Sequence, residues 1–78
     1  MNIKMIVKKI RQEKGISLRK LEEETGIERE YLTDIENGKV LGDEIFLIEA
    51  VLISQALACR VEDLFVIEKL EIKGIGEI

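Results

Sequence analysis

The side chains best suited to molecular recognition lie in the stretch SLRKLEEETGIEREYLTDIENG, residues 17–38. Arg29 can donate two parallel hydrogen bonds to O6 and N7 of guanine, and Glu30 can accept one from N4 of cytosine. If this segment is helical, its polar side lies opposite Leu32 and Ile35. The members of that polar side are Glu30, Thr33 and Asp34.

Catalysis is not indicated by the residue types present. The chain has no His, so the commonest general base is missing, and no pair of Cys or His residues can hold a zinc ion. Its one cysteine, Cys59, lies between two apolar stretches, where a core position is the usual role. We therefore expect that the protein is not an enzyme and that it binds no metal, cofactor or small-molecule substrate.

Two short amphipathic helices with a bend at Gly26 would position the polar side chains. A glycine between two such segments is typical of a helix-turn-helix, because the bend needs a residue that tolerates positive φ. One side of the second helix would pack inward and the other would enter a DNA groove. The apolar residues at helical spacing are Leu18, Leu21, Ile27, Leu32 and Ile35.

Charge is distributed unevenly along the 78 residues, although the net charge is −4. Residues 1–20 hold seven Lys or Arg and one acidic residue, whereas residues 21–78 hold five basic and fifteen acidic residues. Because local field attracts a phosphate backbone, a basic end on an acidic body is compatible with DNA binding. It is equally compatible with head-to-tail self-association.

The length fits one small domain, with no secretory signal and no apolar run of the roughly 20 residues that a membrane span needs. A single cysteine is typical of a reducing compartment. The sequence thus predicts a cytoplasmic protein without a membrane partner.

Periodicity and capping residues predict an all-α domain of five helices. The first begins at a capping Asn2, the second is capped by Ser17, and Asn37-Gly38 ends the third. The fourth is apolar nearly all round, so it is either the central core helix or partly covered by a partner. The expected helices span residues 2–14, 17–26, 28–36, 45–58 and 60–65.

The C-terminal tail changes period. In KLEIKG, residues 69–74, apolar and charged residues alternate, which predicts a β-strand. A single strand is not stable alone in water, so we expect it to pair with its copy in a second subunit or with a following chain; the alternative is a frayed terminus. We accordingly divide the chain into a DNA-binding domain, residues 1–66, and a tail with a dimerising strand, residues 67–78.

With these features in view, the sequence resembles the Cro/C1 (Xre-type) helix-turn-helix family, which includes the lambdoid phage repressors. The resemblance covers roughly residues 6–65. It rests on IRQEKGIS at residues 10–17, the hinge at Leu21, Gly26 and Ile27, LTDIENGK at residues 32–39, and RVEDLF at residues 60–65.

The resemblance implies a lambda-repressor-like domain whose third helix reads the major groove of double-stranded DNA. It implies a structural ion pair between Arg11 and Glu36, which ties the first helix to the end of the third. The positions matched to base reading are Arg29, Glu30 and Asp34, with Thr33 on the same surface. Those expected at phosphates are Ser17, Leu18, Arg19, Tyr31, Asn37 and Lys39.

This sequence departs from the family pattern at several positions. Leu18 replaces a polar residue and has no side-chain hydrogen bond to offer a phosphate. Glu22 stands where a small residue is usual, so we expect it to turn outward or to pair with Arg19 or Lys20. The third helix is acidic apart from Arg29, and each carboxylate near DNA opposes binding.

Two functions follow from these observations. The first is a sequence-specific transcriptional regulator, a repressor, that binds DNA as a homodimer. The second is a protein-interaction module on the same fold, an antitoxin-like or phage accessory protein, whose acidic third helix meets a basic partner and whose DNA binding is weak or absent.

Overall fold

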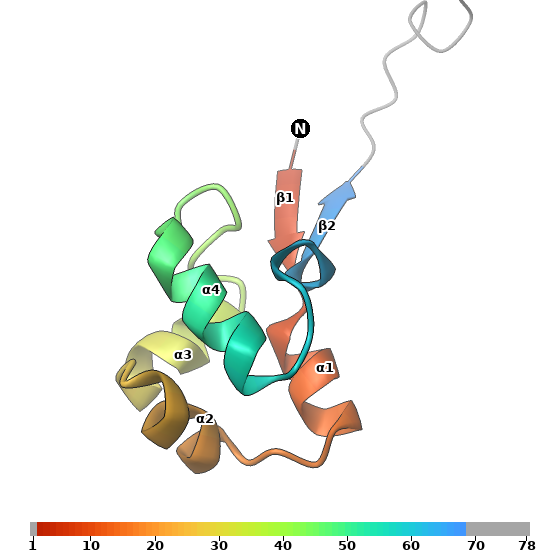
Figure 1. Ribbon diagram of the computed structural model, residues 1–78. Helices are drawn as coiled ribbons and strands as arrows, with labels where there is room; N and C mark the ends of the chain where they lie inside the picture. The colour runs from red at the N-terminus through yellow and green to blue at the C-terminus, as the bar shows by residue number, and fades with distance from the viewer. Residues whose placement is uncertain (1, 69–78) are drawn as a thin grey trace, which may run out of the picture.

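A computed structural model gives the structure of the protein and describes residues 2–68 (Figure 1). Four α-helices form its body: α1 (Val7–Glu13), α2 (Leu18–Thr25), α3 (Arg29–Glu36) and α4 (Leu47–Ala56). A short 3₁₀ helix, η1 (Val61–Leu64), follows α4. Two strands, β1 (Asn2–Met5) and β2 (Phe65–Glu68), pair beside the helices. None of the helices within residues 2–68 is long and apolar enough to cross a membrane.

The helices enclose one aliphatic core. α2 and α3 lie together below α4 in Figure 1, while α1 packs on the other side of the molecule. Apolar side chains from every helix meet there, because each helix has one apolar stripe to bury. The most deeply buried are Val7, Leu21, Leu32, Ile35, Ile53, Leu57 and Leu64.

The predicted bend between α2 and α3 is confirmed. Ser17 is the N-cap of α2, and its Oγ accepts a hydrogen bond from the backbone N–H of Lys20 at 3.0 Å. Gly26 ends the helix with φ +74°, a left-handed conformation that costs other residues free energy. α3 begins at Arg29, with two residues between it and Gly26; the sequence predicted a start at residue 28, one position earlier.

The prediction that the first helix begins near Asn2 is wrong. Residues 2–5 are a β-strand, antiparallel to β2, with Ile3 opposite Ile67 and Met5 opposite Phe65. Met5 is buried and Lys4 is exposed, which is the alternation of a β-strand. The same residues also fit the first turn of a helix with one apolar side. Pairing with β2 favours the strand over the helix, because it gives the backbone N–H and C=O groups of residues 2–5 hydrogen-bond partners.

The C-terminal part also differs from prediction. The expected fifth helix is a single 3₁₀ turn, in which the carboxylate of Asp63 accepts from the backbone N–H of Arg60 at 3.0 Å. The chain then forms β2, which pairs within the same molecule. Within residues 2–68, four α-helices therefore replace the predicted five. The strand expected at residues 69–74 lies outside the described residues.

The fourth helix begins at Leu47, later than predicted. Asp43 and Glu44 belong to a turn before it, where the carboxylate of Glu44 accepts from the backbone N–H of Leu41 at 2.8 Å. The same segment passes close to β1, and the N–H of Gly42 donates to the carbonyl of Ile3 at 2.9 Å. Phe46 is the N-cap, with an extended backbone at φ −73° and ψ 144°, so residues 45 and 46 of the predicted helix lie outside α4.

Candidate nucleic-acid interface

α3 is half buried along its length. Leu32 and Ile35 are fully enclosed, which fixes the orientation of the helix on the core. Of the predicted base-reading residues, Arg29 and Glu30 are exposed and Thr33 and Asp34 are partly exposed. All four thus reach the surface of one short helix. The Thr33 hydroxyl donates to the carbonyl of Arg29 at 2.8 Å, so its proton is used within α3.

The turn before α3 is held by side-chain hydrogen bonds as well as by Gly26. Thr25 is buried, and its hydroxyl donates to the carbonyl of Leu21 at 2.8 Å. The same oxygen accepts from the backbone N–H of Ile27 at 3.1 Å. α3 is therefore fixed relative to α2, as a helix that reads a groove must be.

Glu22 joins the two helices across this turn. One carboxylate oxygen accepts from the backbone N–H of Arg29 at 2.8 Å, and the other accepts from its Nε at 3.2 Å. Glu22 thus reaches the surface, as one of the two expectations had it, but its partner is Arg29 and not Arg19 or Lys20; Arg19 lies 3.7 Å from Glu23 instead. The charge pattern gave no local signal for this contact, because the partners are seven residues apart on different helices.

The structure brings Arg11 and Glu36 together. Nε of Arg11 lies 2.6 Å from one carboxylate oxygen of Glu36, and Nη2 lies 3.1 Å from the other. Only 13% of the Arg11 side chain and 5% of the Glu36 side chain are exposed. Nη1 of Arg11 donates to the carbonyl of Ile16 at 2.9 Å. The pair therefore connects α1, the segment before α2 and the end of α3.

The electrostatic effect of this pair on Arg11 is to favour its charged form. The hydrogen bond to Glu36 raises the pKa of Arg11 above its ordinary value, and the nearby negative charge acts in the same direction, against desolvation. Two forked, charge-assisted hydrogen bonds are stronger than neutral ones. The contact holds the end of α3 that carries Asn37 and Lys39.

The predicted phosphate-contacting residues lie at the ends of α2 and α3. Ser17 and Arg19 are exposed at the start of α2, whereas Leu18 packs partly against the core, so only its backbone N–H could meet a phosphate. Asn37 and Lys39 are exposed beyond the end of α3. The two groups are therefore presented on separate segments of the chain.

Tyr31 points to α4. Its hydroxyl donates to a carboxylate oxygen of Glu49 at 3.0 Å, and the same oxygen accepts from the backbone N–H of Phe46 at 3.2 Å. Burial raises the pKa of Tyr31, and the hydrogen bond to Glu49 raises it further. This network ties the middle of α3 to the beginning of α4.

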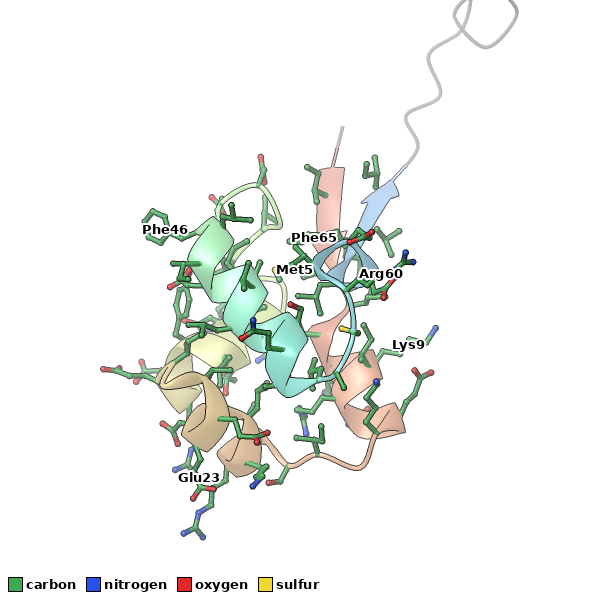
Figure 2. All side chains as sticks on the ribbon, in the orientation of Figure 1. Met5, Lys9, Glu23, Phe46, Arg60 and Phe65 are labelled. Carbon is green, nitrogen blue, oxygen red and sulfur yellow. The ribbon has the colours of Figure 1, made fainter. Side chains whose placement is uncertain are left out.

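Basic side chains gather on α1 and β1. A shallow cavity of about 600 Å³ runs beside them, and its basic lining residues are Lys4, Lys8 and Lys9. In Figure 2, Lys9 extends on the side of the molecule away from Phe46, and Glu23 lies at its lower end. Two acidic residues, Glu13 and Glu36, also line this cavity, so the basic side chains there are not separated from acidic ones.

An apolar run at the start of α4 is the surface feature that no site prediction included. Phe46, Leu47 and Ile48 are 70%, 74% and 63% exposed, and Phe46 points away from the molecule (Figure 2). The apolar character of α4 on all sides was the signal for it. Its buried side packs on α2 and η1, and the opposite side remains uncovered by residues 2–68.

Comparison with known proteins gives one result. Residues 6–63, most of the chain, match the family described as "Helix-turn-helix domain". No curated protein matches the chain. The matched segment runs from the residue before α1 into η1 and contains the bend at Gly26, in agreement with the resemblance to the Cro/C1 (Xre) type. The chain therefore belongs to the helix-turn-helix domain family, a membership that suggests DNA binding.

Proposed function

We propose that the protein is a sequence-specific transcriptional regulator, a repressor, that reads the major groove of double-stranded DNA with α3. The observation that carries the proposal is the arrangement of this helix: Leu32 and Ile35 fix it to the core while Arg29 and Glu30 remain exposed. Arg29 would donate to guanine, and Glu30 would accept from cytosine N4. No step of this function requires catalysis.

Contacts to the DNA backbone would come from the ends of the two helices and from α1. Exposed Arg19 and Lys39 and the hydroxyl of Ser17 are suited to phosphates, and Lys8 and Lys9 add a positive field. Each neutralised phosphate adds about 0.9 to the slope of log K against log salt. The acidic residues of α3 would lower affinity for DNA in general and leave discrimination to the base contacts.

Selection of bound duplexes from a random pool, followed by fluorescence anisotropy over a range of salt, tests this proposal. We expect one enriched motif and an affinity that falls steeply as salt rises. Failure to bind any duplex at low salt would refute it.

We further propose that the regulator is a homodimer whose recognition helices are about 34 Å apart, one turn of DNA. The exposed run Phe46, Leu47 and Ile48 supports this, since contiguous apolar surface of this kind marks interfaces. In a two-fold contact each substitution acts twice. Sedimentation should give twice the monomer mass, and Leu47→Glu should give a folded monomer; a monomeric unmodified protein would refute the proposal.

The second candidate function, a protein-interaction module, is favoured by the acidic surface of α3. Glu28, Glu30 and Asp34 all reach the surface of the helix that would face DNA. Charge reversal by Glu30→Lys and Asp34→Lys separates the two functions. Tighter binding to DNA with an unchanged solution mass would argue that these acids serve no partner protein, whereas lost assembly would favour the second function.

A further inference from the structure

We infer that Glu22 is a positioning residue for base reading: it holds Arg29 so that the outer edge of its guanidinium meets a guanine. The inference rests on the proposed DNA-binding function and deepens it. It assigns one residue of α2 to specificity and names the base that the Glu22–Arg29 pair would select.

The first support is that one carboxylate fixes both the main chain and the side chain of Arg29. Two oxygens of Glu22 accept from two nitrogens of the same residue, at 2.8 Å from the backbone N and 3.2 Å from Nε. Such a two-point contact restricts the first side-chain torsions of Arg29 as well as its backbone. A long, flexible side chain is thereby held in one direction before DNA arrives, which reduces the entropy lost on binding.

The second support is the beginning of α3. Glu28 occupies the N-cap position and, among the described residues, its side chain makes no capping hydrogen bond. The carboxylate of Glu22 supplies an acceptor there instead, and its charge is favourable at the positive end of a helix. Glu22 thus stabilises the start of the helix whose first residue is Arg29.

The third support is the part of the guanidinium that remains available. Glu22 engages Nε, and the hydrogen bonds of Arg29 within residues 2–68 involve neither Nη1 nor Nη2. These two nitrogens can donate to the O6 and N7 acceptors of guanine. Adenine presents the N7 acceptor together with an amino group at N6. That amino group is itself a donor, so it cannot accept the second hydrogen bond from the guanidinium. The arrangement therefore selects guanine against adenine.

The pairing also limits binding that ignores sequence. Arg29 is 58% exposed and Glu22 is 31% exposed, so both lie at the surface that would approach DNA. Paired with a carboxylate, the guanidinium brings no net charge to the duplex. Released from Glu22, it could reach a phosphate and contribute to affinity without regard to sequence. Loss of Glu22 should thus move specificity and general affinity in opposite directions.

The test uses the full chain and a motif selected with it. Anisotropy is measured on the selected duplex, on each single-base variant of it, and on a random duplex. Arg29→Ala first identifies the position at which the preference for guanine depends on Arg29. Glu22→Ala and Glu22→Gln are then measured at that position, and Glu24→Ala is the control, because Glu24 is an exposed acid on the same helix.

We expect the unmodified protein to prefer guanine over adenine there by roughly tenfold or more. Glu22→Ala should lose most of this preference while binding random DNA equally or more tightly, and Glu22→Gln, which keeps an acceptor, should lie between. Glu24→Ala should keep the preference, because it removes the same charge without touching Arg29. Circular dichroism and thermal unfolding of each variant separate these effects from loss of folding, which would weaken binding to every duplex alike.

Three outcomes would overturn the inference. Glu22→Ala could keep the full preference for guanine while Arg29→Ala abolishes it, or Arg29→Ala could leave discrimination unchanged at every position. Equal loss of preference in Glu24→Ala would attribute the effect to charge alone. If the unmodified protein selects no DNA, the proposed function fails and this inference with it, a result distinct from the other three.

Discussion

Removing one partner of the Arg11–Glu36 pair should cost a large part of the stability of this small domain. In Glu36→Ala, Arg11 keeps its hydrogen bond to the carbonyl of Ile16 but loses both bonds to the carboxylate. Breaking a buried ion pair costs about 3–5 kcal/mol. Because 13% of the Arg11 side chain is exposed and one bond remains, we expect the lower end, about 3 kcal/mol.

Urea unfolding followed by circular dichroism measures this loss. With a slope of about 1 kcal/mol per molar urea, the midpoint should fall by roughly 3 M. A domain of this size is stable by only about 5–10 kcal/mol, so the variant would be marginal. Arg11→Met should be comparably destabilised, because it leaves the carboxylate of Glu36 without its partner.

The double variant Arg11→Met/Glu36→Leu distinguishes two causes of the stability loss: the cost of leaving one buried charge without a partner, and the loss of the attraction between the two charges. Replacing both partners by apolar residues removes the buried charge altogether, so stability should return to within about 1 kcal/mol of the unmodified protein. A single-variant cost below about 1 kcal/mol, or single-variant costs that simply add in the double variant, would refute this account of the pair.

Three further outcomes are expected from unfolding measurements. Gly42→Ala should destabilise by about 1–3 kcal/mol, because the new Cβ would overlap the side chain of Ile3 and lie 2.9 Å from its carbonyl oxygen; no change in midpoint would contradict this. Ala58→Gly should stabilise by up to about 1 kcal/mol, since Ala58 has φ +53° and glycine relieves the strain; a destabilised variant would contradict it. The raised pKa of Tyr31 means that its contribution is complete below the unfolded pKa near 10 and is lost as pH rises through the folded pKa. Stability should therefore fall above about pH 10, and Tyr31→Phe, which cannot ionise, should show a smaller fall.

The helix-turn-helix was predictable because its signals are local. Ser17 as a cap, Gly26 at the bend and Asn37-Gly38 at the end each act within a few residues of themselves. The polar side of α3 followed from the apolar spacing of Leu32 and Ile35. These features needed no knowledge of distant parts of the chain.

The sheet could not be predicted in the same way. Ile3, Ile6, Val7 and Ile10 have helical spacing, and only the pairing of residues 2–5 with residues 65–68 makes the first of them part of a strand. The partners are separated by 60 to 66 positions, so a local pattern cannot choose between the two structures.

The Glu22–Arg29 contact was beyond prediction for a different reason. The presence of both charges is evident from sequence, but Glu22 could have paired with Arg19 or Lys20 on its own helix. Which partner it meets depends on the angle between α2 and α3, which Gly26 and Thr25 set in three dimensions.

The pairing of β1 with β2 has a practical consequence for work with this protein. Because the strands are antiparallel, Asn2 and Glu68 lie opposite each other, and both lie on the side of the molecule away from α2 and α3 (Figure 1). An affinity tag, a fluorophore or a fused reporter attached ahead of Asn2 would therefore join the chain far from Arg29 and Glu30. Labels for binding assays belong there, whereas a label on the loop before α4 would sit beside Phe46 and disturb the apolar run.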